Sequence, residues 1–315
     1  MRTRRSRHMS SEGAEAVVRL IIDPVVATGR PRSRVAAYFA LTKPRIIELL
    51  LITTVPAMVL AADGWPGTWL VVATLIGGCL SAGGANTLNN YVDRDIDEVM
   101  RRTKGRPLAR HEVPPRNALV FGVMLGVAGF AWLWIVSNLL AATIATGALL
   151  FYVFVYTKGL KRSSSQNIVI GGAAGAAPAL VGWAAVTGTL GLPAWVLFLV
   201  VFYWTPPHFW ALAIRYRDDY SRAGVPMLPV VAGVQATTRK MLLYTGLMVA
   251  VSLLLVPVAG MRWIYLGAAL ALGAWFLWDT WRVYRRPADA MRLFTTSTVY
   301  LSALFAAVML DVMIR

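Results

Sequence analysis

The stretch TWLVVATLIGGCLSAGGANTLNNYVDRDIDEVMRR, residues 68–102, changes abruptly from apolar to charged. Residues 68–90 carry no charged side chain and are long enough for an α-helix to cross a bilayer, which takes about 20 residues at about 1.5 Å each. The last ten residues hold four acids and three bases. The stretch therefore predicts a transmembrane helix that ends in a dense cluster of charge.

Apolar runs of this kind recur along the chain of 315 residues. Hydrophobic side chains make up 57% of it, charged side chains 15%, and the mean hydropathy is +0.60, outside the range of soluble domains. We therefore predict an all-α integral membrane protein. Its nine predicted spans cover residues 40–62, 68–90, 116–136, 138–156, 167–187, 193–214, 239–258, 262–281 and 293–313.

The formal charge of +16 is confined almost entirely to one side of these spans. Of the 31 Lys and Arg residues, 29 lie in the N-terminal tail, in alternate loops or at the adjoining helix ends, and the exceptions are Arg262 and Arg315. Because cytoplasmic loops are enriched in Lys and Arg, we expect the N-terminus and these loops in the cytoplasm and the C-terminus outside. Topology and contact with anionic membrane lipids account for this charge, so no nucleic-acid partner is predicted.

The chain is expected to divide into a short tail and one membrane domain. In residues 1–35, Arg19 and Asp23 interrupt the apolar run, which argues against a cleaved signal peptide. We interpret this segment as a cytoplasmic tail and residues 36–315 as the transmembrane domain. The predicted inner loops are long and the outer ones short, so a functional site is expected at the cytoplasmic ends of the helices.

Three oxygen-bearing side chains follow the second span at a regular spacing. No Gly or Pro occurs in residues 86–102, so we expect the helix to continue through them. Asn89, Asp93 and Asp97 are then spaced by four residues and share one face, while Asp95 points the opposite way.

Three interpretations of this face compete. One is a solvated helix that carries weak i,i+4 ion pairs on its surface, such as Asp97 with Arg101. Another is an ion pathway, although acids near the middle of the spans would suit that better. The third is a divalent-metal site for a diphosphate, because Mg²⁺ prefers carboxylate oxygens and phosphate, and neighbouring bases can bind the remaining phosphate charge. We favour the third, since acids and bases occur together.

The motif N-x-x-x-D-x-x-x-D formed by Asn89, Asp93 and Asp97 resembles the first aspartate-rich motif of the UbiA superfamily of intramembrane prenyltransferases. Three further segments, at residues 41–58, 156–183 and 204–233, narrow the resemblance to the protoheme IX farnesyltransferases (haem O synthases). The resemblance runs from about residue 36 to the C-terminus. It implies a ring of nine helices around a central cavity that opens to the cytoplasm, in a bacterial plasma membrane.

The resemblance also implies roles for individual residues. Asn89, Asp93 and Asp97 are expected to hold Mg²⁺ on the diphosphate. The residues expected to contact the diphosphate itself are Arg94, Arg101, Arg102, Lys43, Arg45, Lys161 and Arg162. Lys43 and Arg45 equally suit positive-inside anchoring. Tyr156 is expected near the reacting carbon, although a Tyr, Lys and Arg group is also common at membrane interfaces.

The second superfamily motif departs from D-x-x-x-D, because only the adjacent Asp218 and Asp219 remain. Asp218 is a candidate ligand of a second metal, and the alternative is that the pair balances nearby arginines. His208, in the same segment, is a candidate haem ligand. A buried, hydrogen-bonded packing histidine is the commoner case.

The implied reaction transfers a farnesyl group from farnesyl diphosphate to the 2-vinyl group of haem B, with addition of water, giving haem O. The implied partners are these substrates, membrane lipids, and a haem A synthase or terminal oxidase assembly that takes the product. One alternative is a UbiA-type enzyme acting on an aromatic acid or quinone precursor. A membrane transporter or channel is the alternative from a different class, and it leaves the Asn and Asp face unexplained.

Overall fold

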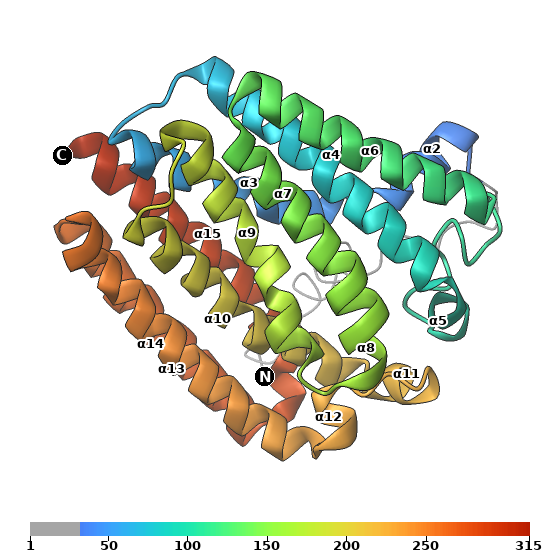
Figure 1. Ribbon diagram of the computed structural model, residues 1–315. Coiled ribbons are helices and arrows are strands. Elements are labelled where there is room, and N and C mark those ends of the chain that lie inside the picture. Colours follow the sequence, from blue (N-terminus) through green and yellow to red (C-terminus); the bar gives the residue numbers. More distant parts are fainter. Residues whose placement is uncertain (1–31) are drawn as a thin grey trace, which may run out of the picture.

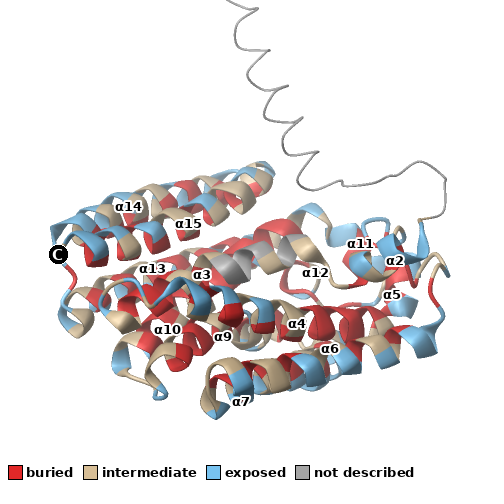
Figure 2. Cartoon of the chain, turned by 90° about the horizontal axis from the view of Figure 1, so that it is seen from above, coloured by how far each residue is buried: buried red, intermediate tan, exposed pale blue. Residues whose placement is uncertain are grey.

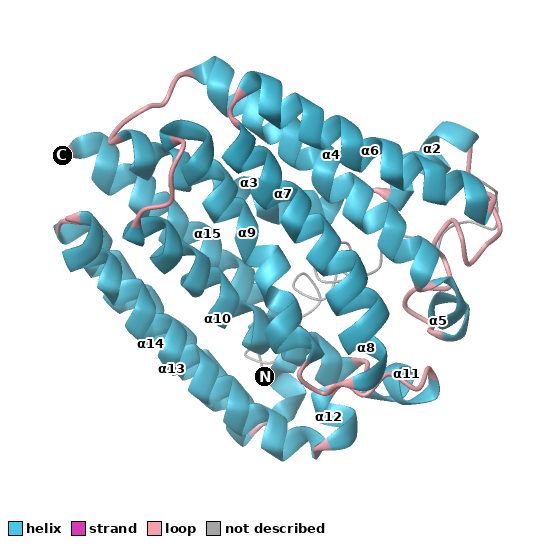
Figure 3. Ribbon diagram, viewed as in Figure 1, coloured by secondary structure: helices cyan, strands magenta, loops and turns pink. Residues whose placement is uncertain are grey.

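The computed structural model describes residues 32–315, apart from the side chains of residues 45, 46 and 48–51. Throughout this part of the chain the regular structure is helical, without strands (Figure 3). Nearly all of the predicted tail, and the side chain of Arg45, lie outside the described residues. The long apolar helices make the chain an all-helical, multi-pass integral membrane protein.

The long helices of the described part follow the predicted spans closely (Figure 1). They are α3 (Pro44–Ala62), α4 (Thr68–Val92), α6 (Pro115–Val136), α7 (Leu139–Leu150) continued by η1 (Phe151–Leu160) and α8 (Lys161–Ser163), α9 (Asn167–Thr187), α10 (Leu192–Arg215), α13 (Gly233–Ala259), α14 (Trp263–Arg285) and α15 (Ala290–Ile314). Seven are long and apolar enough to cross a membrane, and α3 and α14 are the two predicted spans outside that number.

Short helices occupy the charged connections. They are α2 (Arg34–Leu41), α5 (Arg94–Val99), α11 (Arg217–Arg222), α12 (Leu228–Val231) and the 3₁₀ turn η2 (Pro287–Asp289). Ile96 and Met100 from the first long connection and Tyr220 from the second are buried in the same hydrophobic core. The two charged connections are therefore folded parts of the domain.

The long helices form a closed ring in chain order. Each packs against the next, and α15 returns to pack against α3. Helices α9 and α10 make additional contacts with α3 and α15 respectively, and their faces are the most buried (Figure 2). The closed order brings segments from both halves of the chain around one interior.

Glycines allow close approach of neighbouring helices. A Cβ atom at Gly84 of α4 would lie 2.8 Å from the carbonyl oxygen of Gly122 in α6, which is too close for any side chain. On α9, a Cβ atom at Gly171 would clash with the Tyr156 ring, whereas Gly175 faces open space. The α9 glycines thus serve both packing and the cavity.

The expectation of one unbroken helix over residues 86–102 is wrong. Helix α4 ends at Val92, and Asp93, with φ −88° and ψ 5°, forms a bend that leads into α5. Two i→i−4 hydrogen bonds, Asp93 N to Asn89 O and Asp97 N to Asp93 O, both 2.9 Å, continue through the bend. After Val99 the chain turns back because Met100 packs into the core. The bend preserves the predicted order of the three polar residues while changing the direction of the helix.

Candidate active site

A large cavity opens between α3, α4, α7, η1, α9 and α10. The empty space within it, counting the open mouth, is about 1750 Å³. Its interior is lined mainly by small and apolar side chains, among them Leu75, Gly78, Ala82, Ala148, Gly175 and Val181. Its polar lining comes chiefly from the helix ends and charged loops: Lys43, Asn89, Arg102, Arg106, Lys161 and Tyr220. One end therefore suits an anionic group and the interior suits a long apolar one.

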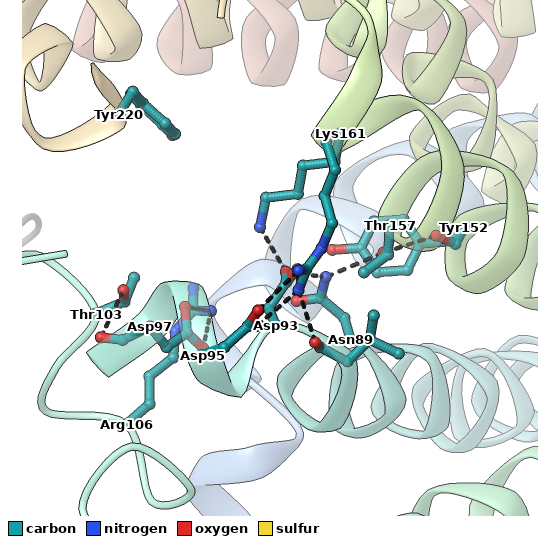
Figure 4. Close-up of polar contacts among 12 residues, drawn as sticks. Asn89, Asp93, Asp95, Asp97, Thr103, Arg106, Tyr152, Thr157, Lys161 and Tyr220 are labelled. Atoms are coloured by element: carbon teal, nitrogen blue, oxygen red, sulfur yellow. Dashed lines mark hydrogen bonds and ion pairs between the residues drawn. The ribbon is translucent and has the colours of Figure 1, made fainter. Parts of the chain in front are cut away.

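Asn89 and Asp93 meet at the centre of the polar end (Figure 4). Both are buried, and the Asn89 amide donates to Oδ2 of Asp93 over 2.8 Å. Lys161, the first residue of α8, lies with its Nζ 2.5 Å from the same carboxylate oxygen. The spacing of four residues thus brings the amide and the carboxylate together, as predicted from a helical face. The base that neutralises the carboxylate, Lys161, comes from a segment distant in the sequence.

Lys43 approaches the Asn89 side chain from the start of α3, with 2.5 Å between its Nζ and Oδ1 of Asn89. Its backbone is left-handed, with φ 53°, a conformation that a residue with a side chain adopts at a cost. The preceding carbonyls of Leu41 and Thr42 accept hydrogen bonds, both 2.9 Å, from Asn90 and Asn86 respectively. Asparagines of α4 therefore hold the turn that directs Lys43 into the site.

Asp97 is neutralised by Arg106 rather than by Arg101. Both carboxylate oxygens accept from one Arg106 nitrogen, at 2.9 and 2.8 Å, and Thr103 donates to the Asp97 carbonyl over 3.3 Å. Arg101 is exposed and does not line the cavity. The i,i+4 pair of Asp97 with Arg101 that a solvated helix would form is therefore absent, and Asp97 pairs with Arg106 across the turn after α5 instead.

Positive charge exceeds negative charge at the polar end. The bases that line the cavity are Lys43, Arg102, Arg106 and Lys161, and the buried acids beside them are Asp93 and Asp97. Burial lowers the pKa of Lys43 well below its ordinary value, and the positive charge of Arg106 lowers it further. The ammonium form of Lys43 therefore gains from any anion that enters the cavity.

The residues present fit a magnesium ion that is shared with a diphosphate. Oδ1 of Asp93 is buried and has no hydrogen-bond partner among the described residues, so a hard oxygen ligand is left available. No three His, Cys, Asp or Glu side chains gather into a metal site within residues 32–315 as described. Mg²⁺ commonly takes one or two carboxylates and completes its shell with water and phosphate. This donor set suits such an ion.

Two of the predicted diphosphate contacts point elsewhere. Arg94 lies over the Tyr91 ring and donates to the Tyr91 carbonyl over 2.8 Å. Arg162 forms two hydrogen bonds of 2.7 Å with exposed Asp95, whose pKa the Arg162 hydrogen bonds lower to about 2. Neither arginine lines the cavity. Arg162 also places a guanidinium nitrogen 3.9 Å from Oδ1 of Asp93. Contact of these two arginines with the diphosphate stays a prediction.

The second aspartate pair is divided between two environments. Asp219 is buried, pairs with Arg222 and accepts from the backbone N–H of Arg102 over 3.3 Å. Asp218 is exposed and does not line the cavity, so the structure does not bring it to the first motif as a metal ligand. The Arg102 side chain donates to the Tyr220 hydroxyl over 3.0 Å. Asp219 and Tyr220 therefore join the two charged connections.

His208 lies outside the cavity lining. Its ring is stacked between Trp204 and Phe294, with centroid separations of 4.2 and 4.3 Å. Its Nδ1 lies 2.6 Å from the Ser297 hydroxyl on α15. Both observations match the packing interpretation, and haem ligation by His208 stays an untested alternative.

Sequence reasoning missed part of the site. Thr157 accepts a hydrogen bond of 3.0 Å from the Asn89 amide, and Tyr152 stacks on Tyr156 with 5.3 Å between ring centroids. The pairing of Arg106 with Asp97 was not predicted either. One feature of the sequence could have pointed to Thr157: it is a threonine within an apolar span, and buried polar side chains in a membrane segment usually have a partner.

Comparisons with known proteins agree with this geometry. The model of the UbiA prenyltransferase family matches residues 50–308. Protoheme IX farnesyltransferase 2 of Saccharopolyspora erythraea is 50% identical over 313 residues, covering 97% of this chain and 96% of the relative. Protoheme IX farnesyltransferase of Clavibacter michiganensis is 55% identical over 280 residues, covering 87% and 92%.

Solved structures show the same fold at lower identity. A digeranylgeranylglyceryl phosphate synthase matches with a TM-score of 0.75 at 17% identity, covering 90% of this chain and 99% of that one. A UbiA homologue from Archaeoglobus fulgidus, bound to DMAPP and Mg²⁺, matches with a TM-score of 0.65 at 16% identity, covering 86% and 98%. From its matched model and its relatives, the chain belongs to the UbiA prenyltransferase family.

Proposed function

We propose that this chain transfers the farnesyl group of farnesyl diphosphate to the 2-vinyl group of haem B, with addition of water, giving haem O. The observation that carries the proposal is the cluster of Lys43, Asn89, Asp93 and Lys161 at the polar end of a largely apolar cavity. The relatives named protoheme IX farnesyltransferase, at least half identical over most of the chain, support this choice of substrates.

The proposal treats α3 and α14 as spans too, so that residues 36–315 form a nine-span domain behind a cytoplasmic tail. The cavity then opens to the cytoplasm, because its polar end lies among the loops that hold 29 of the 31 Lys and Arg residues. The bacterial relatives support a location in a bacterial plasma membrane. A haem A synthase or a terminal oxidase assembly is the proposed recipient of the product.

Magnesium is the proposed cofactor, held by Asp93, Asp97 and the amide oxygen of Asn89 together with diphosphate oxygens. Oδ1 of Asp93 supports this assignment, since it accepts no hydrogen bond among the described residues and its ion pair with Arg162 is long, at 3.9 Å. Mg²⁺ bound in a homologous fold supports it as well. Bound there, Mg²⁺ supplies positive charge that weakens the bond to the leaving diphosphate.

The side chains act on the leaving group. Heterolysis of the C1–O bond sends the electron pair to pyrophosphate, and Lys43, Lys161 and Arg106 neutralise the charge that develops there. Lys161 and Arg106 contact carboxylates in this structure, so they exchange a carboxylate for a phosphate oxygen when the diphosphate binds. Their movement links substrate binding to the chemistry.

The apolar interior protects the allylic cation that remains. Side chains such as Leu75 and Val181 offer it no nucleophile and limit the access of water. The terminal vinyl carbon of haem B forms a bond to C1, and the cation on the adjacent carbon takes up water and loses one proton. The proposed route needs no nucleophilic side chain.

Incubation of the purified protein with haem B, farnesyl diphosphate and Mg²⁺, followed by mass spectrometry, tests the proposal. We expect haem that has gained one farnesyl group and one water, and no such product from the Asp93→Asn variant. Unchanged haem beside a prenylated aromatic acid, when both acceptors are supplied, would instead select the alternative prenyltransferase.

A further inference from the structure

Thr157 is a fully buried polar residue in η1 that does not line the cavity. Its hydroxyl contacts two groups, the Tyr152 carbonyl at 2.8 Å and the Asn89 amide nitrogen at 3.0 Å. Polar side chains inside membrane segments are costly unless they are paired, and they often serve function. The pairing of Thr157 connects it directly to the acid cluster.

The proton of this hydroxyl determines how Asn89 lies. A threonine hydroxyl has one proton, and here it is donated to the Tyr152 carbonyl. Towards Asn89 the oxygen can therefore only accept, so the Asn89 side chain must present its NH₂ group. The hydroxyl thus distinguishes the two ends of the amide.

The other partners of Asn89 require the same orientation. Its NH₂ group also donates to the Asp93 carboxylate over 2.8 Å, and its oxygen accepts from the Lys43 ammonium over 2.5 Å. A carboxylate accepts and an ammonium donates, so all three contacts agree. The amide oxygen is consequently turned towards Lys43, which lines the cavity.

The π-helical register of η1 sets the position of Thr157. Buried threonines in the α-helices, such as Thr87 and Thr237, donate to the carbonyl four residues earlier. Thr157 donates to the carbonyl five residues earlier, as the wider turn of a π-helix allows. The wider turn accompanies the contact of Thr157 with α4.

From these contacts we infer that Thr157 is a positioning residue that fixes the Asn89 amide, with its oxygen turned towards the metal and diphosphate site. The inference rests on the proposed function for the identity of that ligand. Without the hydroxyl, the NH₂ group of Asn89 loses one of its two acceptors, and the amide can turn away. Thr157 acts through Asn89 and does not itself contact the substrate.

The test compares Thr157→Val and Thr157→Ala with Thr157→Ser in the full-length protein. Loss of an outer-shell partner typically weakens metal binding by about 10- to 100-fold, so the Val and Ala variants should raise the half-saturating Mg²⁺ concentration by that factor. The Ser variant keeps the hydroxyl and should restore wild-type Mg²⁺ dependence. Thr237→Val, which removes a buried hydroxyl bonded only to its own helix in the described contacts, is the matched control.

A second readout avoids turnover. Farnesyl thiodiphosphate, an unreactive analogue, should bind with Mg²⁺ more weakly to the Val and Ala variants, as titration calorimetry will show. In an Asn89→Ala background, Thr157→Val should cause no further loss, because the two residues act through one contact.

The results separate this inference from the proposed function. If the wild-type protein makes no farnesylated haem, the proposed function fails. Binding of farnesyl thiodiphosphate and Mg²⁺ to the Thr157 variants still tests the positioning role in that case. Folded Val and Ala variants that bind the analogue and Mg²⁺ like the wild type would overturn the positioning role. An equal loss from Thr157→Val with and without Asn89 would overturn it as well.

Discussion

Lys161 and Asp93, 68 residues apart in the sequence, form a buried ion pair with 2.5 Å between Nζ and Oδ2. The carboxylate is fully buried and its other oxygen has no hydrogen-bond partner among the described residues. Lys161 therefore neutralises the carboxylate through Oδ2, and Oδ1 is left for a second cation to share.

Replacing either carboxylate of the first motif should abolish transfer. Asp93→Asn and Asp97→Asn keep the shape of the side chain and remove the negative charge proposed to hold Mg²⁺. We expect kcat/KM to fall by at least about a hundredfold, because even outer-shell changes cost about 10- to 100-fold. Product formation by mass spectrometry is the measurement.

Glu98→Gln is the control for these two variants. Glu98 lies in the same short helix, is about half exposed and points to His111 on the surface. It should retain wild-type turnover. Near-normal turnover in the Asp93 and Asp97 variants would remove the metal assignment.

Adjacent bases in α8 should behave differently. Lys161→Gln removes a cation that lines the cavity, and a charge-assisted contact to phosphate is worth about 1.5–3 kcal/mol, or roughly 10- to 100-fold in kcat/KM. Arg162→Gln removes contacts with exposed Asp95 and the Val92 carbonyl and a longer ion pair of 3.9 Å with Asp93. Arg162 does not line the cavity, so kcat/KM should change by less than about threefold. Steady-state kinetics at saturating Mg²⁺ distinguish them, and equal losses would refute the assignment.

The second aspartate pair offers a comparison of neighbours. Asp219→Asn weakens a buried contact that joins the two charged connections, so we expect a lower Tm and a transfer rate reduced by roughly tenfold. Asp218→Asn alters an exposed side chain and should leave both unchanged. Thermal unfolding in detergent and turnover assays measure the effects, and a larger loss at Asp218 would contradict this division.

His208 should prove to be structural. His208→Phe preserves the stacking between Trp204 and Phe294 but loses the contact with Ser297, which costs about 1–3 kcal/mol. The variant should have a lower Tm and an unchanged absorption spectrum of bound haem. A shifted Soret band would instead show that His208 binds iron.

The long helices were predictable because their apolar runs have clear ends. The predicted span 167–187 coincides with α9, and 116–136 differs from α6 by one residue. Helix α13 begins at Gly233, six residues before the predicted start, because its first turns are polar and hydropathy does not detect a helix that extends beyond the membrane. Hydropathy locates the apolar part of a helix and leaves its polar ends undefined.

The candidate site was predictable only where it is local. The spacing of Asn89, Asp93 and Asp97 follows from one helix, and the structure keeps Asn89 beside Asp93. Their bases come from distant segments, and their identity depends on how the ring closes. The bend at Asp93 and the π-helical turn depend on tertiary packing, so the roles of Arg94 and Thr157 could not be read from spacing.

The π-helix Phe151–Leu160 also limits the length of sequence that can fill this position. A π-helix places about one more residue in each turn than an α-helix. An α-helix of the same ten residues would turn each residue by about 100°, more than a π-helix does, so Lys161 would end at a different angle to Asp93 unless the number of residues also changed. A residue count, as well as residue identity, is therefore a requirement that this site places on evolution and on protein engineering.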